Sequence, residues 1–341
     1  MSIIAVEEAF VTAELLDIWT EILEQGIESH GDPAFDSIYS PILKLAQTQE
    51  LRNKLLDVDK TRLADMDKNG VAVQLLSVTA PGVQIFDSEA ARSFTIHTND
   101  YLSDIVAKHP TRFYGLITVS PSDPNFSAQE LERMAGKENM VGIIINSHTN
   151  GKYLDDEFYF PIFAKAEELD LPIYLHPSTP NPNMVEPLLK YGLEGPMWGF
   201  AADTGLHALR LILSGVFDRF PNLQMVLGHM GEGLPYWLHR LDSRLPLSQM
   251  LDKTGRLQEL KKLPSEYFKS NLHISTSGMN WSPVLRFVCD VIGVDRVMFA
   301  IDYPYESSEP AVLGLKESKL TDEEKRQIFE LNAQRLFNIS T

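Results

Sequence analysis

The chain alternates short apolar runs with amphipathic segments, and this alternation constrains its fold more than any other feature. Most of the runs are rich in Val and Ile and are apolar at consecutive positions, as expected for strands buried on both faces. Eight runs cover residues 3–8, 71–79, 113–120, 141–147, 172–177, 223–230, 272–277 and 297–303. Helical spacing of three to four fills most gaps, at residues 61–68, 88–108, 128–134, 158–169, 206–217, 283–291 and 323–337.

Eight strands that alternate with helices over 341 residues predict an α/β fold of the (β/α)8 barrel type. A doubly wound open sheet is the alternative, and it is disfavoured because no Gly-rich phosphate loop follows the first run. Residues 11–60 and 231–271 form insertions after the first and sixth strands, where a barrel builds its active-site face. Because no linker or repeat interrupts the chain, we expect one domain over residues 1–341.

Charge and composition exclude several function classes. Asp and Glu number 47 against 30 Lys and Arg, and the resulting net charge of −17 disfavours binding to nucleic acids or anionic membranes. A single cysteine, Cys289, leaves no internal disulfide framework and fits a small buried apolar residue. The first residues lack the pattern of a secretory signal, and no apolar run approaches the roughly 20 residues of a membrane span, so we expect a cytoplasmic protein.

Polar side chains mark the carboxyl ends of four predicted strands. Glu7 and Glu8 end the first run, and His176, His229 and Asp302 end the fifth, sixth and eighth. Each alone has a plain structural explanation, such as a hydrogen-bonded histidine, a solvated strand end or a turn cap. In a barrel, however, these ends meet at one mouth, and oxygen and imidazole ligands together suit Mn²⁺, Zn²⁺, Fe²⁺ or, less readily, Mg²⁺.

Arg240 follows the sixth strand within the second insertion. Its position alone fits an ordinary surface arginine equally well, but the planar guanidinium is a natural clamp for a carboxylate.

Several motifs resemble the amidohydrolase superfamily. They are Glu-Glu-Ala-Phe (7–10), Leu-His-Pro (175–177), Gly-His-Met-Gly-Glu-Gly-Leu-Pro-Tyr (228–236), Thr-Ser-Gly (276–278) and Asp-Tyr-Pro-Tyr (302–305). Within that superfamily the chain is most similar to the nonoxidative aromatic-acid decarboxylases, which act on γ-resorcylate, 2,3-dihydroxybenzoate or 5-carboxyvanillate. The last branch is the most similar, through residues 145–158, 79–84, 199–200 and 234–242.

The resemblance implies one divalent metal ion held by Glu7, His176 and Asp302. Because this ligand set is rich in oxygen, we expect Mn²⁺ rather than Zn²⁺ or Mg²⁺, and the reaction requires no organic cofactor. Ala9 stands where many members carry a second first-strand ligand, and strand four ends without the lysine that bridges two metals in binuclear relatives.

The resemblance also indicates which residues surround Asp302 and bind the substrate. His229 is expected to pair with Asp302, and Glu232 to orient His229. Arg240 matches the family arginine that binds the substrate carboxylate, from its own subunit or across an interface of a homodimer or homotetramer. A further family arginine in the first insertion has no match here, and Lys44 is the nearest cation.

The implied reaction is decarboxylation of an ortho-hydroxylated aromatic acid, in which Asp302 protonates the ring carbon and CO2 leaves. The aromatic side chains expected to flank the ring are Trp198, Phe200, Phe10 and Tyr303.

Three alternative functions are compatible with the same residues. A hydrolase of the superfamily, such as a lactonase or amidohydrolase, would use Asp302 as a general base. Decarboxylation of a nonaromatic muconate semialdehyde is mildly disfavoured by Ala9. A noncatalytic barrel with a degenerate site would have no need for an intact ligand set.

Overall fold

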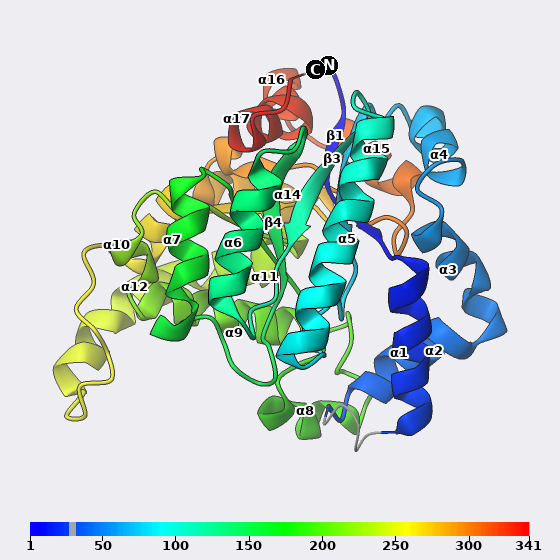
Figure 1. The fold of residues 1–341 in the computed structure, drawn as a ribbon. Helices are drawn as coiled ribbons and strands as arrows, with labels where there is room; N and C mark the ends of the chain where they lie inside the picture. The colour runs from blue at the N-terminus through cyan, green and yellow to red at the C-terminus, as the bar shows by residue number, and fades with distance from the viewer. Residues whose placement is uncertain (27–31, 341) are drawn as a thin grey trace.

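The computed structural model describes residues 1–26 and 32–340, which form an eight-stranded barrel surrounded by helices (Figure 1). The strands are β1 (Ile4–Phe10), β2 (Val73–Val78), β3 (Phe113–Thr118), β4 (Met140–Asn146), β5 (Ile173–His176), β6 (Met225–Leu227), β7 (Leu272–Ser275) and β8 (Val297–Met298). All eight were predicted, although β8 is much shorter than the apolar run at 297–303.

The strands pair in parallel and in chain order, from β1 next to β2 through to β7 next to β8. Backbone hydrogen bonds between β1 and the segment that follows β8 nearly close the sheet, with Val6 N donating to Phe299 O at 3.1 Å and Ala9 N donating to Tyr303 O at 2.7 Å. This sequential order confirms the (β/α)8 barrel and rules out the doubly wound sheet, whose strand order reverses at a switch point.

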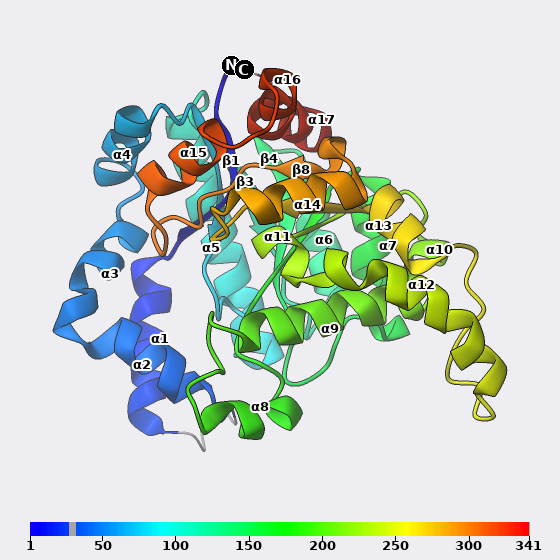
Figure 2. The same cartoon turned by 180° about the vertical axis from the view of Figure 1, so that it is seen from behind.

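Helices cover the outside of the barrel (Figures 1 and 2). Those between β1 and β5 are α1 (Ala13–Gln25), α2 (Phe35–Lys44), α3 (Gln49–Leu56), α4 (Thr61–Asn69), α5 (Ser88–Lys108), α6 (Pro124–Ala135) and α7 (Phe160–Glu168). Those between β5 and β8 are α8 (Pro182–Leu189), α9 (Gly199–Leu213), α10 (Val216–Arg219), α11 (His229–Glu232), α12 (Leu234–Leu251), α13 (Pro264–Asn271) and α14 (Ser282–Ile292). After β8 come α15 (Ser308–Lys316), α16 (Asp322–Arg326), a π-helical turn over Gln327–Leu331 and α17 (Asn332–Phe337).

The outer helices pack through one apolar stripe each. In α14 the buried residues Leu285, Val288, Cys289 and Ile292 recur every three or four positions, which is the spacing of a single helix face. Cys289 lies in this stripe, and burial raises the pKa of its thiol to about 11, as expected for a packing residue rather than a reactive one.

Two groups of inserted helices lie on opposite sides of the barrel. Helices α1, α2 and α3 follow β1 on one side, and α12 projects from the other (Figures 1 and 2). Helix α8 lies close to α1 and α2 in both views. None of the helices formed by residues 1–26 and 32–340 is long and apolar enough to cross a membrane.

Candidate metal and active site

Three potential metal ligands meet at the carboxyl ends of the strands. Glu7 lies on β1, His176 ends β5 and Asp302 follows β8, and one ligand atom of each lies within 4.8 Å of the other two. The structure therefore brings together the set that the sequence and the family resemblance predicted.

Glu7 is held by the barrel interior so that one carboxylate oxygen remains free. Its Oε2 accepts hydrogen bonds from Tyr174 Oη and, at 2.9 Å, from Ser275 Oγ. Its Oε1 is buried and has no hydrogen-bond partner among the described residues. Burial alone raises the pKa of Glu7, but His229, His176 and the two hydroxyl donors outweigh this effect. The pKa of Glu7 is therefore below its ordinary value, and the carboxyl is ionised at neutral pH. Because an unpaired buried carboxylate oxygen is costly, this atom fits a ligand of a divalent cation.

His176 presents its other ring nitrogen to the same point. Its Nδ1 lies 2.7 Å from Pro177 O, and donation to that carbonyl leaves Nε2 with a free lone pair. Nε2 lies 3.4 Å from Glu7 Oε1. A backbone carbonyl that fixes the imidazole tautomer in this way is typical of metal-binding histidines.

His229 stands beside these ligands on an unusual turn. Residues 229–233, which include α11, all have positive φ, including 48° at His229 and 53° at Glu232. Left-handed backbone is unfavourable for non-glycine residues and is concentrated at functional sites. The turn places His229 Nδ1 2.8 Å from Glu232 Oε1 and His229 Nε2 3.8 Å from both Glu7 Oε1 and Asp302 Oδ2.

The pKa values of His229 and Asp302, the two groups predicted to take part in proton transfer, are both raised, but for different reasons. Burial alone lowers the pKa of His229, but the carboxylates of Glu232 and Glu7 raise it well above the ordinary value. Burial raises the pKa of Asp302, with His229 acting in the opposite direction. A carboxyl that holds its proton more readily suits a general acid.

A cavity of about 440 Å³ opens next to His176, His229 and Asp302. Its volume falls within the range of small-molecule sites. The other lining residues are Ser37, Ile38, Tyr39, Ile42, Thr79, Ala80, Pro177, Gly192, Glu194, Gly195, Pro196, Phe200, Tyr305 and Glu306. Among the described residues that line it there is neither lysine nor arginine.

The predicted aromatic residues separate into three groups. Phe200 lines the cavity, as expected. Phe10 and Tyr303 do not, and for them the structure corrects the expectation: Phe10 is fully buried and stacks on Tyr101 with ring centroids 5.9 Å apart, and Tyr303 is buried with the Arg62 guanidinium 4.6 Å from its ring centroid. Both aromatic rings are therefore packing residues of the core.

Trp198, Arg240 and Lys44 also lie outside this cavity within one copy of the chain. Lys44 is exposed at the end of α2. Arg240 is exposed on α12 and lines a separate, largely apolar cavity of about 650 Å³ together with Trp198 and Trp237. The exposed fractions of these two tryptophans are 58% and 51%, which is unusual for side chains of this size.

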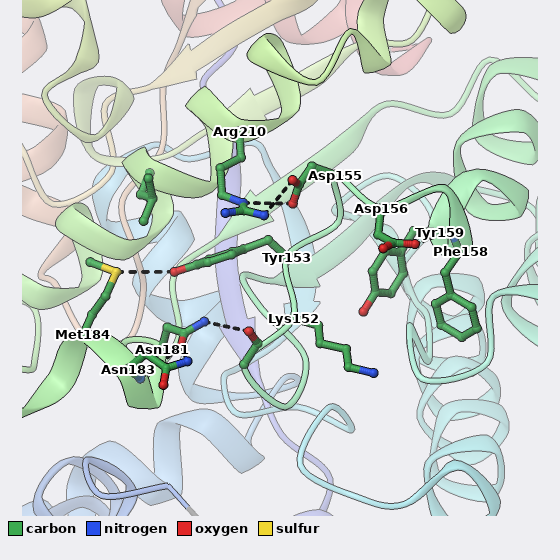
Figure 3. A pocket seen from close by; sticks show the side chains of 12 residues that line it. Lys152, Tyr153, Asp155, Asp156, Phe158, Tyr159, Asn181, Asn183, Met184 and Arg210 are labelled. Carbon is green, nitrogen blue, oxygen red and sulfur yellow. Dashed lines mark hydrogen bonds and ion pairs between the residues drawn. The ribbon is translucent and has the colours of Figure 1, made fainter. Parts of the chain in front are cut away.

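A further cavity, of about 760 Å³, adjoins the motif at residues 145–158 (Figure 3). Arg210 pairs with both carboxylate oxygens of Asp155 at 2.9 and 2.7 Å, and Asn181 Nδ2 donates to Gly151 O at 2.8 Å. Tyr153 separates these two contacts in the cavity wall.

Below this cavity lies a serine, histidine and aspartate set that resembles a nucleophilic triad. Ser147 Oγ donates directly to Asp203 at 2.6 Å, however, and His207 Nε2 accepts from Leu154 N at 2.9 Å. Ser147, Asp203 and His207 are all fully buried, so no substrate reaches the hydroxyl. These contacts fix the segment after β4 to α9 and give no catalytic group.

The sequence did not identify several residues of the site. Tyr174 and Ser275 hold Glu7, and Tyr174 had a usable signal because it lies two positions before His176 and so faces the same side of its strand. Tyr39 and Glu194 come from the helices and loops outside the barrel strands, where no periodic pattern marks them.

The comparisons agree with this geometry. The model of the amidohydrolase family matches residues 56–339. A γ-resorcylate decarboxylase from Polaromonas sp. (strain JS666) is 36% identical over 299 residues, covering 85% of this chain and 90% of the relative.

Two solved structures share the whole fold and both contain manganese. The 5-carboxyvanillate decarboxylase of Novosphingobium aromaticivorans DSM 12444, complexed with 4-hydroxy-3-methoxy-5-nitrobenzoic acid, is 40% identical with a TM-score of 0.95, covering 99% of this chain and 96% of its own. A dihydroxybenzoic acid decarboxylase from Polaromonas sp. JS666, with the inhibitor 2-nitroresorcinol, is 35% identical with a TM-score of 0.84, covering 99% and 97%.

Proposed function

This chain belongs to the amidohydrolase family, and we infer that it is a metal-dependent, nonoxidative decarboxylase of aromatic carboxylic acids. The observation that carries this inference is the meeting of Glu7, His176 and Asp302 beside a small-molecule cavity, in a fold shared with manganese-containing decarboxylases. The finer proposal is that the substrate carries a hydroxyl group ortho to the carboxylate that is lost.

We propose that Glu7, His176 and Asp302 hold one divalent ion, with Mn²⁺ the preferred metal. The free Glu7 Oε1 and the Nε2 of His176 supply the oxygen and nitrogen ligands that such an ion requires. When bound, the ion supplies a Lewis acid that lowers the pKa of an adjacent phenol and helps to orient the ring.

Asp302 carries the proton in this proposal. Its carboxyl donates a proton to the ring carbon that bears the substrate carboxylate, and a C–H bond forms there. The carbon–carbon bond to the carboxylate then breaks, its electron pair returns to the ring, and neutral CO2 leaves. Asp302 remains as a carboxylate until it takes up a proton again. His229 and Glu232 set the proton affinity of Asp302 from the side.

The substrate ring lies, we propose, against Phe200 in the cavity. A guanidinium is the natural partner of its carboxylate, and the described lining residues of the same copy include neither arginine nor lysine. Arg240 is exposed on α12, a helix that projects from the barrel (Figure 2). It lines the same separate cavity as Trp198. We therefore propose that Arg240 reaches the cavity of a second copy, with Trp198 at the same contact, in a homodimer or homotetramer.

Two further expectations from the sequence remain proposals of the same kind. One is that residues 1–341 act as a single domain, and the other is that the protein works in the cytoplasm.

The function is tested with a substrate panel in the presence of Mn²⁺. The panel pairs 2-hydroxybenzoate with 4-hydroxybenzoate, and adds 2,3- and 2,6-dihydroxybenzoate, vanillate, 5-carboxyvanillate and an aromatic lactone, followed by ring absorbance and CO2 release. We expect CO2 from at least one ortho-hydroxylated acid and none from 4-hydroxybenzoate, with loss of turnover after chelation. Ring opening of the lactone without CO2 release from any acid would instead identify a hydrolase.

A further inference from the structure

Glu8, the neighbour of the metal ligand Glu7, has no part in the mechanism above and yet is fully buried. Its two carboxylate oxygens accept backbone hydrogen bonds from residues on either side of Asp302. Ile301 N donates to Glu8 Oε1 at 2.9 Å, and Tyr303 N donates to Glu8 Oε2 at 3.1 Å. The N–H between them, that of Asp302, donates to Glu7 O at 3.2 Å. Three successive amides are thus fixed by two successive residues of β1.

This arrangement matters because Asp302 has a left-handed backbone, with φ at 75°. A non-glycine residue adopts this conformation only when its surroundings enforce it. Residues 299–303 extend beyond the short strand β8 and meet β1 only through separate backbone hydrogen bonds at Phe299, Asp302 and Tyr303, not through a continuous ladder. The Glu8 carboxyl adds two hydrogen bonds to these at the point where the Asp302 side chain turns toward Glu7 and His176.

Arg62 supports the same turn from the opposite side. It is fully buried on α4, its guanidinium lies over the ring of Tyr303, and it donates to Ala9 O and, at 3.2 Å, to Gln74 Oε1. Burial raises the pKa of Glu8 well above its ordinary value, and the positive charge of Arg62 acts in the opposite direction. The turn that carries Asp302 is therefore held by two buried side chains, Glu8 and Arg62, neither of which lines the cavity.

We propose that Glu8 is the positioning residue for Asp302: it holds Ile301–Tyr303 in the left-handed turn from which Asp302 protonates the substrate. This inference rests on the proposed function, but it assigns to Glu8 an effect on the proton-transfer step rather than on substrate binding. Displacing a reacting group by about 1 Å lowers rates by up to roughly 10²-fold, so the effect belongs in kcat.

The test compares Glu8→Gln and Glu8→Ala with Glu130→Gln. The amide of Glu8→Gln keeps one acceptor oxygen, whereas Glu8→Ala keeps none. Glu130 is the matched control, because it is also a buried carboxylate but lies on α6, in the outer helix layer. It accepts hydrogen bonds from Asn99 on α5 and from Arg133 on α6. For each Mn²⁺-loaded protein one measures kcat, KM, the unfolding midpoint and the affinity for 2-nitroresorcinol as an unreactive probe.

We expect kcat to fall at least about 10-fold in Glu8→Gln and further in Glu8→Ala, with KM and probe affinity changed less than about threefold. Glu130→Gln should lose stability without losing kcat. An unchanged kcat in Glu8→Gln, or an equal fall in Glu130→Gln, would overturn the inference and leave the proposed function intact.

A structure of Glu8→Gln gives a readout independent of turnover. We expect the Asp302 carboxyl to shift away from Glu7 and His176. If Asp302 keeps its left-handed backbone and its place beside these ligands, Glu8 does not position it. A wild-type protein that decarboxylates no member of the panel would contradict the proposed function instead, and the structure of the variant would still decide the role of Glu8.

Discussion

In the proposed mechanism, Asp302 has two tasks that make opposite demands on one carboxyl group. As a metal ligand it must be ionised, and as an acid it must carry a proton. The structure places it between groups that pull in both directions, since burial raises its pKa while His229 and His176 lower it. The net effect is a raised pKa, which suits a group that both accepts and donates a proton.

Replacing Asp302 by Asn tests its role as the acid. The amide keeps the size of the side chain and one ligand oxygen but cannot donate an acidic proton. We expect kcat to fall by at least about 10²-fold while Mn²⁺, measured by metal analysis after gel filtration, stays bound at near one per chain. A variant with metal bound and a kcat near that of the wild type would show that another group is the acid.

Tyr174 gives a second prediction at this scale. Without its hydroxyl, Glu7 loses one of its two donors and turns more freely. We expect Tyr174→Phe to bind Mn²⁺ about 10- to 100-fold more weakly, measured by titration of the apoprotein. Tyr114→Phe is the control, because Tyr114 is a buried tyrosine of β3 whose hydroxyl bonds Ser340 O instead. Equal Mn²⁺ affinity in the two variants would mean that the Tyr174 bond does not support the site.

Residue by residue, the sequence was informative where side chains stand at strand ends. Glu7, His176, His229 and Asp302 could be found because barrel topology gathers those ends at one mouth. Phe10 and Tyr303 could not be placed, since their contacts with Tyr101 and Arg62 depend on how distant segments pack. Glu8 was visible as a strand-end carboxylate, but its partners lie 293 and 295 positions further along the chain.

At the level of elements, the alternation of apolar runs located every strand, while helix ends were less predictable. Helix α9 begins at Gly199, although the apolar pattern suggested a start at 206. Its first turns contain Gly205, Asp203 and Thr204, which are poor helix formers, and burial of this stretch against the barrel stabilises it instead. The left-handed turn at 229–233 was equally hidden, because its geometry depends on contacts with β7.

The buried His207 on α9 predicts how stability depends on pH. Burial lowers the pKa of His207 to about 3, with His148 and Arg210 contributing, whereas an unfolded histidine titrates near 6.5. Because the unfolded chain binds the proton and the folded chain does not, this contribution is complete above about pH 6.5 and is lost as the pH falls toward 3. At pH 5 the loss is on the order of 2 kcal/mol for this one group.

Denaturant unfolding between pH 7.5 and 5 measures this effect. His207→Gln should be less stable than the wild type at pH 7.5 but should lose stability less steeply as the pH falls. His239→Gln, at an exposed position of α12, should keep the wild-type slope. If His207→Gln retains the full wild-type slope, the histidine is not held neutral in the fold.

On the scale of the whole molecule, a net charge of −17 and a cavity without its own lysine or arginine face an anionic substrate. The molecule as a whole does not attract such a ligand, so the attraction has to be local. A metal ion and an arginine from a second copy would supply it, and in that case assembly would be required for substrate binding.

Mixing two inactive variants tests the shared site. Arg240→Ala subunits lack the carboxylate clamp and Asp302→Asn subunits lack the acid. If Arg240 acts across a twofold interface, a mixed dimer has one complete site, and an equal, re-equilibrated mixture should recover about one quarter of wild-type activity. No recovery in a mixture shown by mass spectrometry to contain mixed dimers would place Arg240 in the site of its own subunit.

The most direct test of the account is the fate of the proton when the Mn²⁺-loaded protein acts in D2O, under argon, on the best acid of the panel. Protonation of the ring by an exchangeable carboxyl predicts one CO2 per product molecule and one deuterium at the carbon that bore the carboxylate, measured by NMR and mass spectrometry. Both should disappear after chelation and return with Mn²⁺. Product formed without CO2, with deuterium elsewhere on the ring, or undiminished after chelation would contradict metal-dependent decarboxylation at Glu7, His176 and Asp302.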